Sequence, residues 1–281
     1  MIYSRNCEIK EGLDFPEGMS RIALGLEYAG ATHQGFQRQA STENTIQQYL
    51  ELALSNIAQE PITLVCAGRT DAGVHATGQV VHFDTLADRP EKAWVLGANT
   101  KLPDTIRIHW AKKVGETFHA RFSAGSRCYR YILRSAATRS ATLGKGVTHV
   151  AYTLDDKAMQ RASSYLLGEH DFSAFRAAQC QAANPVRNVE HIHWFRQGEL
   201  LVLEICANAF LHHMVRNIVG TLLEVGRGAR SAEWVQEVLD GRDRRAAGPT
   251  ASPWGLYLVD VAYADKFALP KTPKGPVFLA Q

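Results

Sequence analysis

Cysteine is scarce in this chain of 281 residues, and its few cysteines are widely spaced. They are odd in number and contain no C-x-x-C pair: Cys7, Cys66, Cys128, Cys180 and Cys206. This spacing indicates neither a disulfide framework nor a zinc site. His212 and His213 are adjacent, and adjacent histidines on one helix point about 100° apart, so we do not expect them to chelate one ion.

Three other signals are missing from the sequence. The N-terminus has no basic segment followed by an apolar core of about 7 to 15 residues, and no apolar run approaches the roughly 18 residues that span a bilayer. There is no P-loop, no dinucleotide-binding fingerprint and no cluster of metal ligands. We therefore expect a cytoplasmic protein that needs no cofactor and no metal.

Acidic residues are absent from one stretch, Arg121 to Leu154. Six basic residues occur in that stretch: Arg121, Arg127, Arg130, Arg134, Arg139 and Lys145. Tyr129 and Tyr131 alternate with the arginines, and cations beside aromatic rings suit a nucleic-acid surface. A solvated face or a flexible loop is the alternative interpretation. The chain as a whole is 46% hydrophobic and 21% charged, which describes a globular protein long enough for two domains.

The hydrophobic pattern predicts two α/β halves, residues 21–115 and 116–268, with a polar extension over 1–20 and an extended, mobile tail over 269–281. In the first half we expect one helix, which begins near Thr42 or Asn44, and strands over 23–28, 62–66, 79–83 and 106–111. In the second half we expect helices over 155–167, 211–225 and 232–239, and strands over 129–134, 189–195, 200–206 and 256–263. An active site at the junction is the natural expectation.

A charged pair, Arg69 and Asp71, lies between two glycines in the stretch Gly68-Arg69-Thr70-Asp71-Ala72-Gly73-Val74-His75. Apolar residues precede and follow this stretch, which predicts a loop between two strands. Glycines allow a sharp turn or close approach of a ligand, so Asp71 is a candidate functional carboxylate. In the alternative, Asp71 caps backbone N–H groups of a tight turn and Arg69 is its ion partner. Spacing alone leaves both interpretations open.

The run GRTDAGVHATGQVVHF resembles the catalytic motif of the bacterial tRNA pseudouridine synthase A family. Further blocks of agreement extend over roughly residues 21 to 263: EYAGATHQGFQRQ, FHARFSA, CYRYI, GEHDFSAF, NAFLHHMVRN and GLYL. The resemblance implies an α+β fold in which a mixed central sheet is built from two similar halves, with helices on its flanks and a basic cleft between the halves. It also implies a homodimer that acts on the tRNA anticodon stem-loop, at positions 38, 39 and 40.

Conversion of uridine to pseudouridine breaks the bond from N1 to C1′ and joins C5 to C1′, without net redox change. A carboxylate serves this chemistry as a nucleophile or as a charge stabiliser at C1′. We therefore expect Asp71 to be catalytic, with Arg69 or Arg216 keeping it ionised. A glycosidase would use two carboxylates, and the stretch from Arg69 to Phe83 offers only Asp71.

The resemblance assigns roles to further residues. Tyr129 matches the tyrosine that stacks on the target uracil and is a candidate for taking the C5 proton; Arg216 matches the arginine that pairs with the aspartate; and Leu256 matches an apolar residue beside the base. The remaining residues expected to contact the substrate are His75, Arg127 and Arg130. Two alternatives to this isomerase remain: a non-catalytic tRNA-binding or chaperone protein, and a synthase for another RNA.

Overall fold

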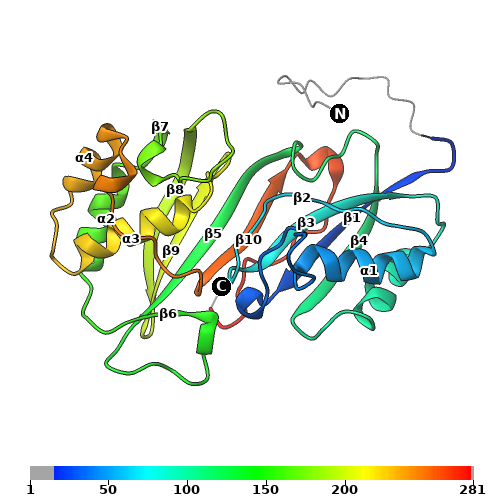
Figure 1. Ribbon diagram of the computed structural model, residues 1–281, viewed down its shortest axis with the longest axis horizontal. Coiled ribbons are helices and arrows are strands. Elements are labelled where there is room, and N and C mark those ends of the chain that lie inside the picture. The colour runs from blue at the N-terminus through cyan, green and yellow to red at the C-terminus, as the bar shows by residue number, and fades with distance from the viewer. Residues whose placement is uncertain (1–15, 280–281) are drawn as a thin grey trace.

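The computed structural model describes residues 16–279 and is built on one large mixed β-sheet. Ten strands belong to the sheet, and its main order is β4-β1-β3-β10-β5-β9-β8-β7. Helices lie beside it at both ends of the molecule (Figure 1). The expected α+β class with a mixed central sheet is confirmed. Among residues 16–279, no helix combines the length and apolar character needed to cross a membrane.

The first half of the chain supplies one edge of the sheet, one α helix and a short π helix (Ala93–Gly97). Its elements are β1 (Ser20–Tyr28), α1 (Ile46–Ala58), β2 (Val65–Cys66), β3 (His75–Thr85) and β4 (Ile106–Val114). β1 pairs antiparallel with both β3 and β4. Helix α1 begins at Ile46 because the Thr45 side chain accepts a hydrogen bond from the Gln48 N–H, so the cap is Thr45 rather than Thr42 or Asn44.

The second half supplies the other edge and three helices. Its elements are β5 (Ala124–Ser135), β6 (Thr148–Val150), α2 (Asp156–Ser164), β7 (Gly168–Asp171), β8 (Val186–Gln197), β9 (Leu200–Ala207), α3 (Met214–Gly226), α4 (Trp234–Gly241) and β10 (Leu256–Tyr263). The expected hairpin is β8 and β9, which pair antiparallel from Val189 to Gln197. Helix α2 is capped by Asp155, whose side chain accepts from the Ala158 N–H.

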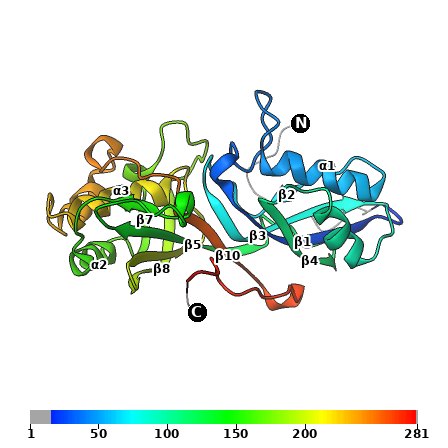
Figure 2. The same ribbon diagram turned by 90° about the horizontal axis from the view of Figure 1, so that it is seen from below.

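The two halves join through β10, the last strand of the chain. β10 lies between β3, which it pairs in parallel, and β5, which it pairs antiparallel. Figure 2 shows the two ends of the molecule on either side of this central strand. The sheet is therefore continuous from one half to the other, and the loops at its centre come from both.

At β5 the two faces of the sheet belong to different cores. Tyr129, Tyr131 and Leu133 of β5 pack in one core with buried residues of all four α helices. Cys128 and Ile132, on the opposite face, belong to a smaller core. This alternation follows from the two-residue period of a strand.

A disulfide joins Cys128 of β5 to Cys206 of β9. The sequence expectation that no disulfide forms is wrong for this pair. The two cysteines are 78 residues apart, and only the antiparallel register of β5 and β9 sets them opposite one another.

The ends of the chain differ from expectation where the structure describes them. Residues 1–15 of the expected extension lie outside the described residues, and β1 begins at Ser20. The expected mobile tail lies against the sheet: Leu279 is buried, and the Arg130 side chain donates to the carbonyl oxygens of Lys274 and Gly275. The prolines near the C-terminus predicted an extended, mobile segment. Arg130, which holds this segment against the sheet, lies 144 residues before Lys274 in the chain, so no local pattern indicated the contact.

Candidate active site

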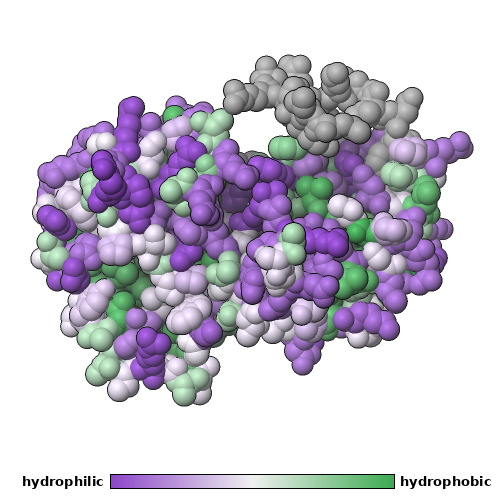
Figure 3. Space-filling view, viewed as in Figure 1, coloured by the Kyte–Doolittle hydropathy of each residue, from purple (hydrophilic) through white to green (hydrophobic). Residues whose placement is uncertain are grey.

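A cleft of about 1030 Å³ opens between the two halves. One wall consists of residues 34–37, 64–72 and Val74; the opposite wall includes Tyr129, Leu256 and residues 209–216. Figure 3 shows a mainly hydrophilic surface around the middle of the molecule, where the two halves meet. The active site that we expected at the junction therefore corresponds to a real concavity.

The loop between β2 and β3 holds Asp71 at this cleft. The Thr70 carbonyl accepts a hydrogen bond from the Phe36 N–H at 3.0 Å, and the Thr70 hydroxyl lies 2.7 Å from the buried Tyr28 hydroxyl. Gly73 has φ of +83°, a conformation that a residue with a Cβ rarely adopts. Fixed on both sides, the loop presents the Asp71 side chain, which is 23% exposed, to the cleft.

Arg216 in the first turn of α3 reaches across to Asp71. Its Nη1 donates to Asp71 Oδ2 at 3.2 Å, while its Nε donates to the Ala251 carbonyl at 2.9 Å. These two partners fix the guanidinium in position. The Arg216 side chain is only 14% exposed, so little water reaches the ion pair. The structure thus brings together the carboxylate and the arginine that the sequence placed 145 residues apart.

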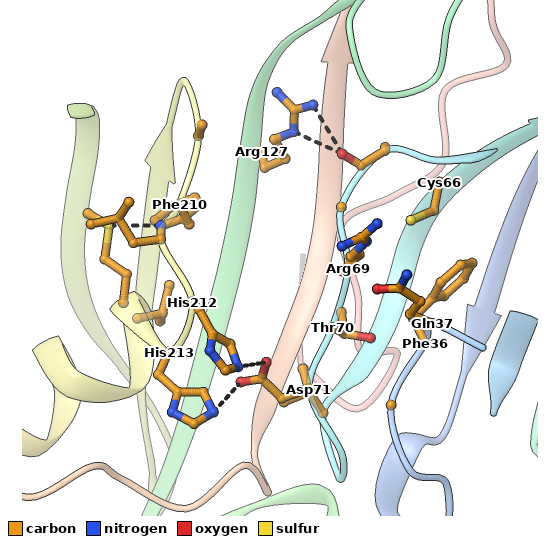
Figure 4. Close-up of a pocket in the computed structure, with 18 of the residues that line it drawn as sticks. Phe36, Gln37, Cys66, Arg69, Thr70, Asp71, Arg127, Phe210, His212 and His213 are labelled. Atoms are coloured by element: carbon orange, nitrogen blue, oxygen red, sulfur yellow. Dashed lines mark hydrogen bonds and ion pairs between the residues drawn. The ribbon is translucent and has the colours of Figure 1, made fainter. Parts of the chain in front are cut away.

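Two histidines also face the Asp71 carboxylate (Figure 4). His212 Nε2 lies 3.4 Å from Asp71 Oδ1, and His213 Nε2 lies 3.4 Å from Asp71 Oδ2. Burial lowers the pKa of His213 below its ordinary value, although the nearby Asp71 carboxylate acts in the other direction. The neutral imidazole is therefore the favoured form of His213 at pH 7.

The expectation that His212 and His213 lie on one helix and point about 100° apart is wrong. Helix α3 begins at Met214, so neither histidine lies within it. His213 has φ of +61°, in the left-handed region, and both rings turn toward the same carboxylate. The apolar residue Leu211 had led us to start the expected helix three residues before its actual first residue, Met214. An angle of 100° between neighbours holds only inside a helix.

Tyr129 and Leu256 contribute a ring and an aliphatic side chain to the cleft wall opposite the Asp71 loop. Tyr129 is 8% exposed and packs edge-on against Phe210, with ring centroids 5.0 Å apart. Burial raises the pKa of the Tyr129 hydroxyl, and the negative charge of Asp71 raises it further. Leu256 is buried where β10 begins. A planar base that entered the cleft would meet a ring and an aliphatic side chain beside the carboxylate.

Arg69 and Arg127 line the same cleft but are held differently. Arg69 is exposed and makes no hydrogen bond or ion pair with any residue of 16–279. Arg127 donates to the carbonyl oxygens of Ala67, Ala124 and Asn208, and to that of Arg121. Its charge has no carboxylate partner within the described part of the chain. Both cations leave the cleft positive.

Arg130 and His75 lie outside the cleft. Arg130 Nε donates to Glu204 Oε2 at 2.8 Å, on the other face of β5 from Tyr129. His75 stacks on Tyr257, with ring centroids 4.6 Å apart, and its Nε2 lies 3.0 Å from the Lys145 carbonyl. The structure therefore does not bring these two candidates together with Asp71.

Phe210 and Arg187 also line the cleft, and neither was among the expected site residues. Phe210 occurs in the block NAFLHHMVRN, whose agreement with the family was a signal for it. Arg187 at the start of β8 is half-buried, and its Nε has no hydrogen-bond partner among the described residues. No sequence pattern marked Arg187, because its position depends on the pairing of β7 with β8.

The family model described as tRNA pseudouridine synthase matches residues 26–123 and 162–264. The chain belongs to the tRNA pseudouridine synthases, the enzymes that isomerise uridine to pseudouridine in tRNA.

Within that family, the similar curated proteins share one name. The tRNA pseudouridine synthase A of Pseudoalteromonas atlantica is 56% identical over 260 residues, which cover 92% of this chain and 98% of that protein. The enzyme of the same name from Haemophilus influenzae strain Rd is 56% identical over 259 residues, or 92% of this chain and 96% of its own. The expected membership of the tRNA pseudouridine synthase A family is confirmed.

Among solved structures, the archaeal box H/ACA sRNP Nop10-Cbf5 complex is similar at a TM-score of 0.35 and 10% identity. The alignment covers 80% of this chain and 60% of that one. A H/ACA RNP bound to a substrate RNA containing 2′-deoxyuridine gives a TM-score of 0.32 at 10% identity, covering 81% and 69% of the two chains. Both superpositions are too loose to support an argument about this chain.

Proposed function

We propose that this protein isomerises uridine to pseudouridine at positions 38, 39 and 40 of the tRNA anticodon stem-loop, with Asp71 as the nucleophile. One observation carries the proposal: a carboxylate from the first half and the guanidinium of Arg216 from the second meet at 3.2 Å inside the cleft. The Ala251 carbonyl holds the same guanidinium, so Arg216 fixes the position of this carboxylate in the cleft.

The proposed reaction begins with the target uridine flipped out of its stack into the cleft, at a cost of roughly a few kcal/mol. Asp71 attacks C1′ or stabilises positive charge there while the bond from N1 to C1′ breaks. The uracil turns while it stays bound between Tyr129 and Leu256. C5 then bonds to C1′ as the bond from the Asp71 oxygen to C1′ breaks and frees the carboxylate; the proton on C5 leaves, and N1 gains a proton.

Tyr129 has a defined role in this scheme. Its ring stacks on the uracil, and its hydroxyl relays the C5 proton. Because burial raises its pKa, the hydroxyl is protonated at neutral pH. Tyr129 therefore passes its own proton to a water molecule as it receives the one from C5, rather than acting as a phenolate.

The cations of the cleft supply the affinity for tRNA in this proposal. Arg69 and Arg127 lack carboxylate partners within residues 16–279, so their charges are available to phosphates. His75 and Arg130 lie outside the cleft and do not contact the bound uridine in this proposal. We also propose a cytoplasmic homodimer, as the family resemblance implies.

The test is tritium release from C5-labelled uridine in unmodified tRNA, followed by mapping of the modified positions. Wild type should release tritium at the anticodon stem-loop. Asp71→Ala and Asp71→Asn should both abolish release, by at least about 10⁴-fold, because no other carboxylate lies in the cleft among the described residues.

A matched control is Asp88→Ala, which removes an exposed carboxylate outside the cleft and should leave turnover unchanged. Filter binding should show that Asp71→Ala still binds tRNA nearly as tightly as wild type, since phosphate contacts dominate affinity. Normal turnover by Asp71→Ala would contradict the proposal. Binding without release by wild type would favour a non-catalytic tRNA-binding protein, and release only from another RNA would reassign the substrate.

A further inference from the structure

The two imidazoles beside Asp71 lie at distances that a hydrogen bond does not explain well. Each Nε2 is 3.4 Å from a carboxylate oxygen, whereas N–H···O hydrogen bonds cluster between about 2.7 and 3.2 Å. Ligand atoms about 2.0–2.1 Å from a tetrahedral metal ion are roughly 3.4 Å apart, so these separations equal an edge of such a coordination polyhedron.

The three side chains converge from both walls of the cleft. One nitrogen from His212, one from His213 and an oxygen of Asp71 all lie within 4.8 Å of one another. The imidazole rings have their centroids 4.0 Å apart, and both rings face the Asp71 carboxylate (Figure 4). Two imidazoles and one carboxylate are the donor set of several zinc sites, in which water completes the coordination.

We propose that Asp71, His212 and His213 form a binding site for a borderline-soft divalent cation such as Zn²⁺, and that this ion inhibits the enzyme. This inhibition rests on the proposed role of Asp71: the ion would occupy the carboxylate that attacks C1′, so metal and target uridine compete for one group. No step of the isomerisation requires the ion.

Charge and ligand type set the selectivity and strength of the site. Imidazole ligands favour Zn²⁺ and neighbouring transition metals over Mg²⁺, which prefers oxygen ligands and keeps its waters. Arg216 lies 3.2 Å from Asp71 and opposes a second positive charge there. We therefore expect micromolar rather than nanomolar affinity, and no competition from the Mg²⁺ that tRNA itself needs.

The direct test is titration calorimetry with Zn²⁺ alone, so it does not depend on turnover. Cys7, Cys66 and Cys180 are replaced by serine in every sample, because free thiolates also bind zinc. In this background His212→Ala/His213→Ala should weaken Zn²⁺ binding at least tenfold. Unchanged binding by this double variant overturns the proposal.

A second histidine pair provides the matched control. His191 and His193 lie on β8 near Glu204, outside the cleft, with ring centroids 6.2 Å apart. His191→Ala/His193→Ala should retain the zinc isotherm of its background. If this variant loses binding while the His212/His213 variant keeps it, the ion binds on β8 and the proposal fails.

Arg216→Gln distinguishes the proposed site from adventitious binding, because it should tighten Zn²⁺ binding, whereas the double histidine variant should weaken it. Removal of the opposing cation should tighten Zn²⁺ binding roughly tenfold, although the same substitution impairs the chemistry. Equal or weaker affinity would contradict the placement of the ion beside Asp71. In the wild type, Zn²⁺ should also stop tritium release, and a chelator should restore it; inhibition that the double histidine variant shares would contradict the link between site and inhibition.

Discussion

The two faces of β5 carry arginines that differ in whether a carboxylate neutralises their charge. Arg127, on the cleft face, donates only to backbone carbonyl oxygens. Arg130, three residues later on the opposite face, forms an ion pair with Glu204, which Lys274 also approaches at 3.4 Å. One face therefore keeps a positive charge without a counter-ion, and the other balances its charges within the protein.

This difference explains how a chain of modest net charge presents a basic cleft. Hydrogen bonds to backbone oxygens fix the Arg127 guanidinium and leave its charge unneutralised. Asp71 is the one acidic residue lining the cleft within the described part of the chain, and Arg216 pairs with it. A phosphate backbone would meet cations on this face, and the opposite face would stabilise the sheet.

The largest effect should separate two tyrosines on the cleft face of β5. Tyr129→Phe should lower kcat on the order of 10²-fold or more with little change in stability, because it removes a proposed proton relay that makes no hydrogen bond among residues 16–279. Tyr131→Phe should instead lower the free energy of unfolding by about 1–3 kcal/mol, because the Tyr131 hydroxyl is buried between Thr148 and the Ser252 carbonyl.

Single-turnover kinetics and urea unfolding measure the two effects. Loss of activity in Tyr131→Phe equal to that in Tyr129→Phe would show that the strand is needed only for packing, and it would remove Tyr129 from the proposed chemistry.

A smaller effect should distinguish the two arginines in tRNA binding. Arg127→Gln should weaken tRNA binding and reduce the slope of log K against log salt by about 1, as expected when one phosphate contact is lost. Arg130→Gln should leave that slope unchanged, since Glu204 already neutralises Arg130 outside the cleft. Filter binding over a range of salt concentrations provides the measurement. Identical slopes in the two variants would abolish the distinction between the faces.

The smallest effect concerns the pH dependence of stability at the ion pair between Arg130 and Glu204. Burial raises the pKa of the Glu204 carboxyl, but the hydrogen bond from Arg130 and the charge of Lys274 outweigh burial and hold it below its ordinary value. A lowered folded-state pKa stabilises the fold above the unfolded pKa of about 4.3, and the contribution disappears as pH falls through the folded value.

Arg130→Gln should accordingly cost about 1–3 kcal/mol of unfolding free energy at pH 7, and less as the pH falls below 4. Urea unfolding of wild type and variant at several pH values tests this. A difference that stays constant from pH 7 to pH 3 would mean that packing, rather than charge, accounts for the effect of Arg130.

Local patterns predicted most of the elements. The final strand, Leu256–Tyr263, has the expected bounds, and the β8–β9 hairpin was expected around residues 196–199. Residues 62–66 were expected to form a longer strand than the two-residue β2, because an apolar run does not reveal how much of it finds a partner. The start of α3 was misplaced because apolar spacing continues past the point where the backbone turns left-handed at His213.

By itself, the sequence determined the α+β class, the family and the loop that carries Asp71, because strand alternation, glycine placement and an unbroken motif are local properties. Only the tertiary structure decided which side chains meet. Arg216 and both histidines reach Asp71, Cys128 reaches Cys206, and Arg130 turns away from the cleft. Each of these outcomes depends on strand register and on the packing of one half against the other, which bring together residues far apart in the chain.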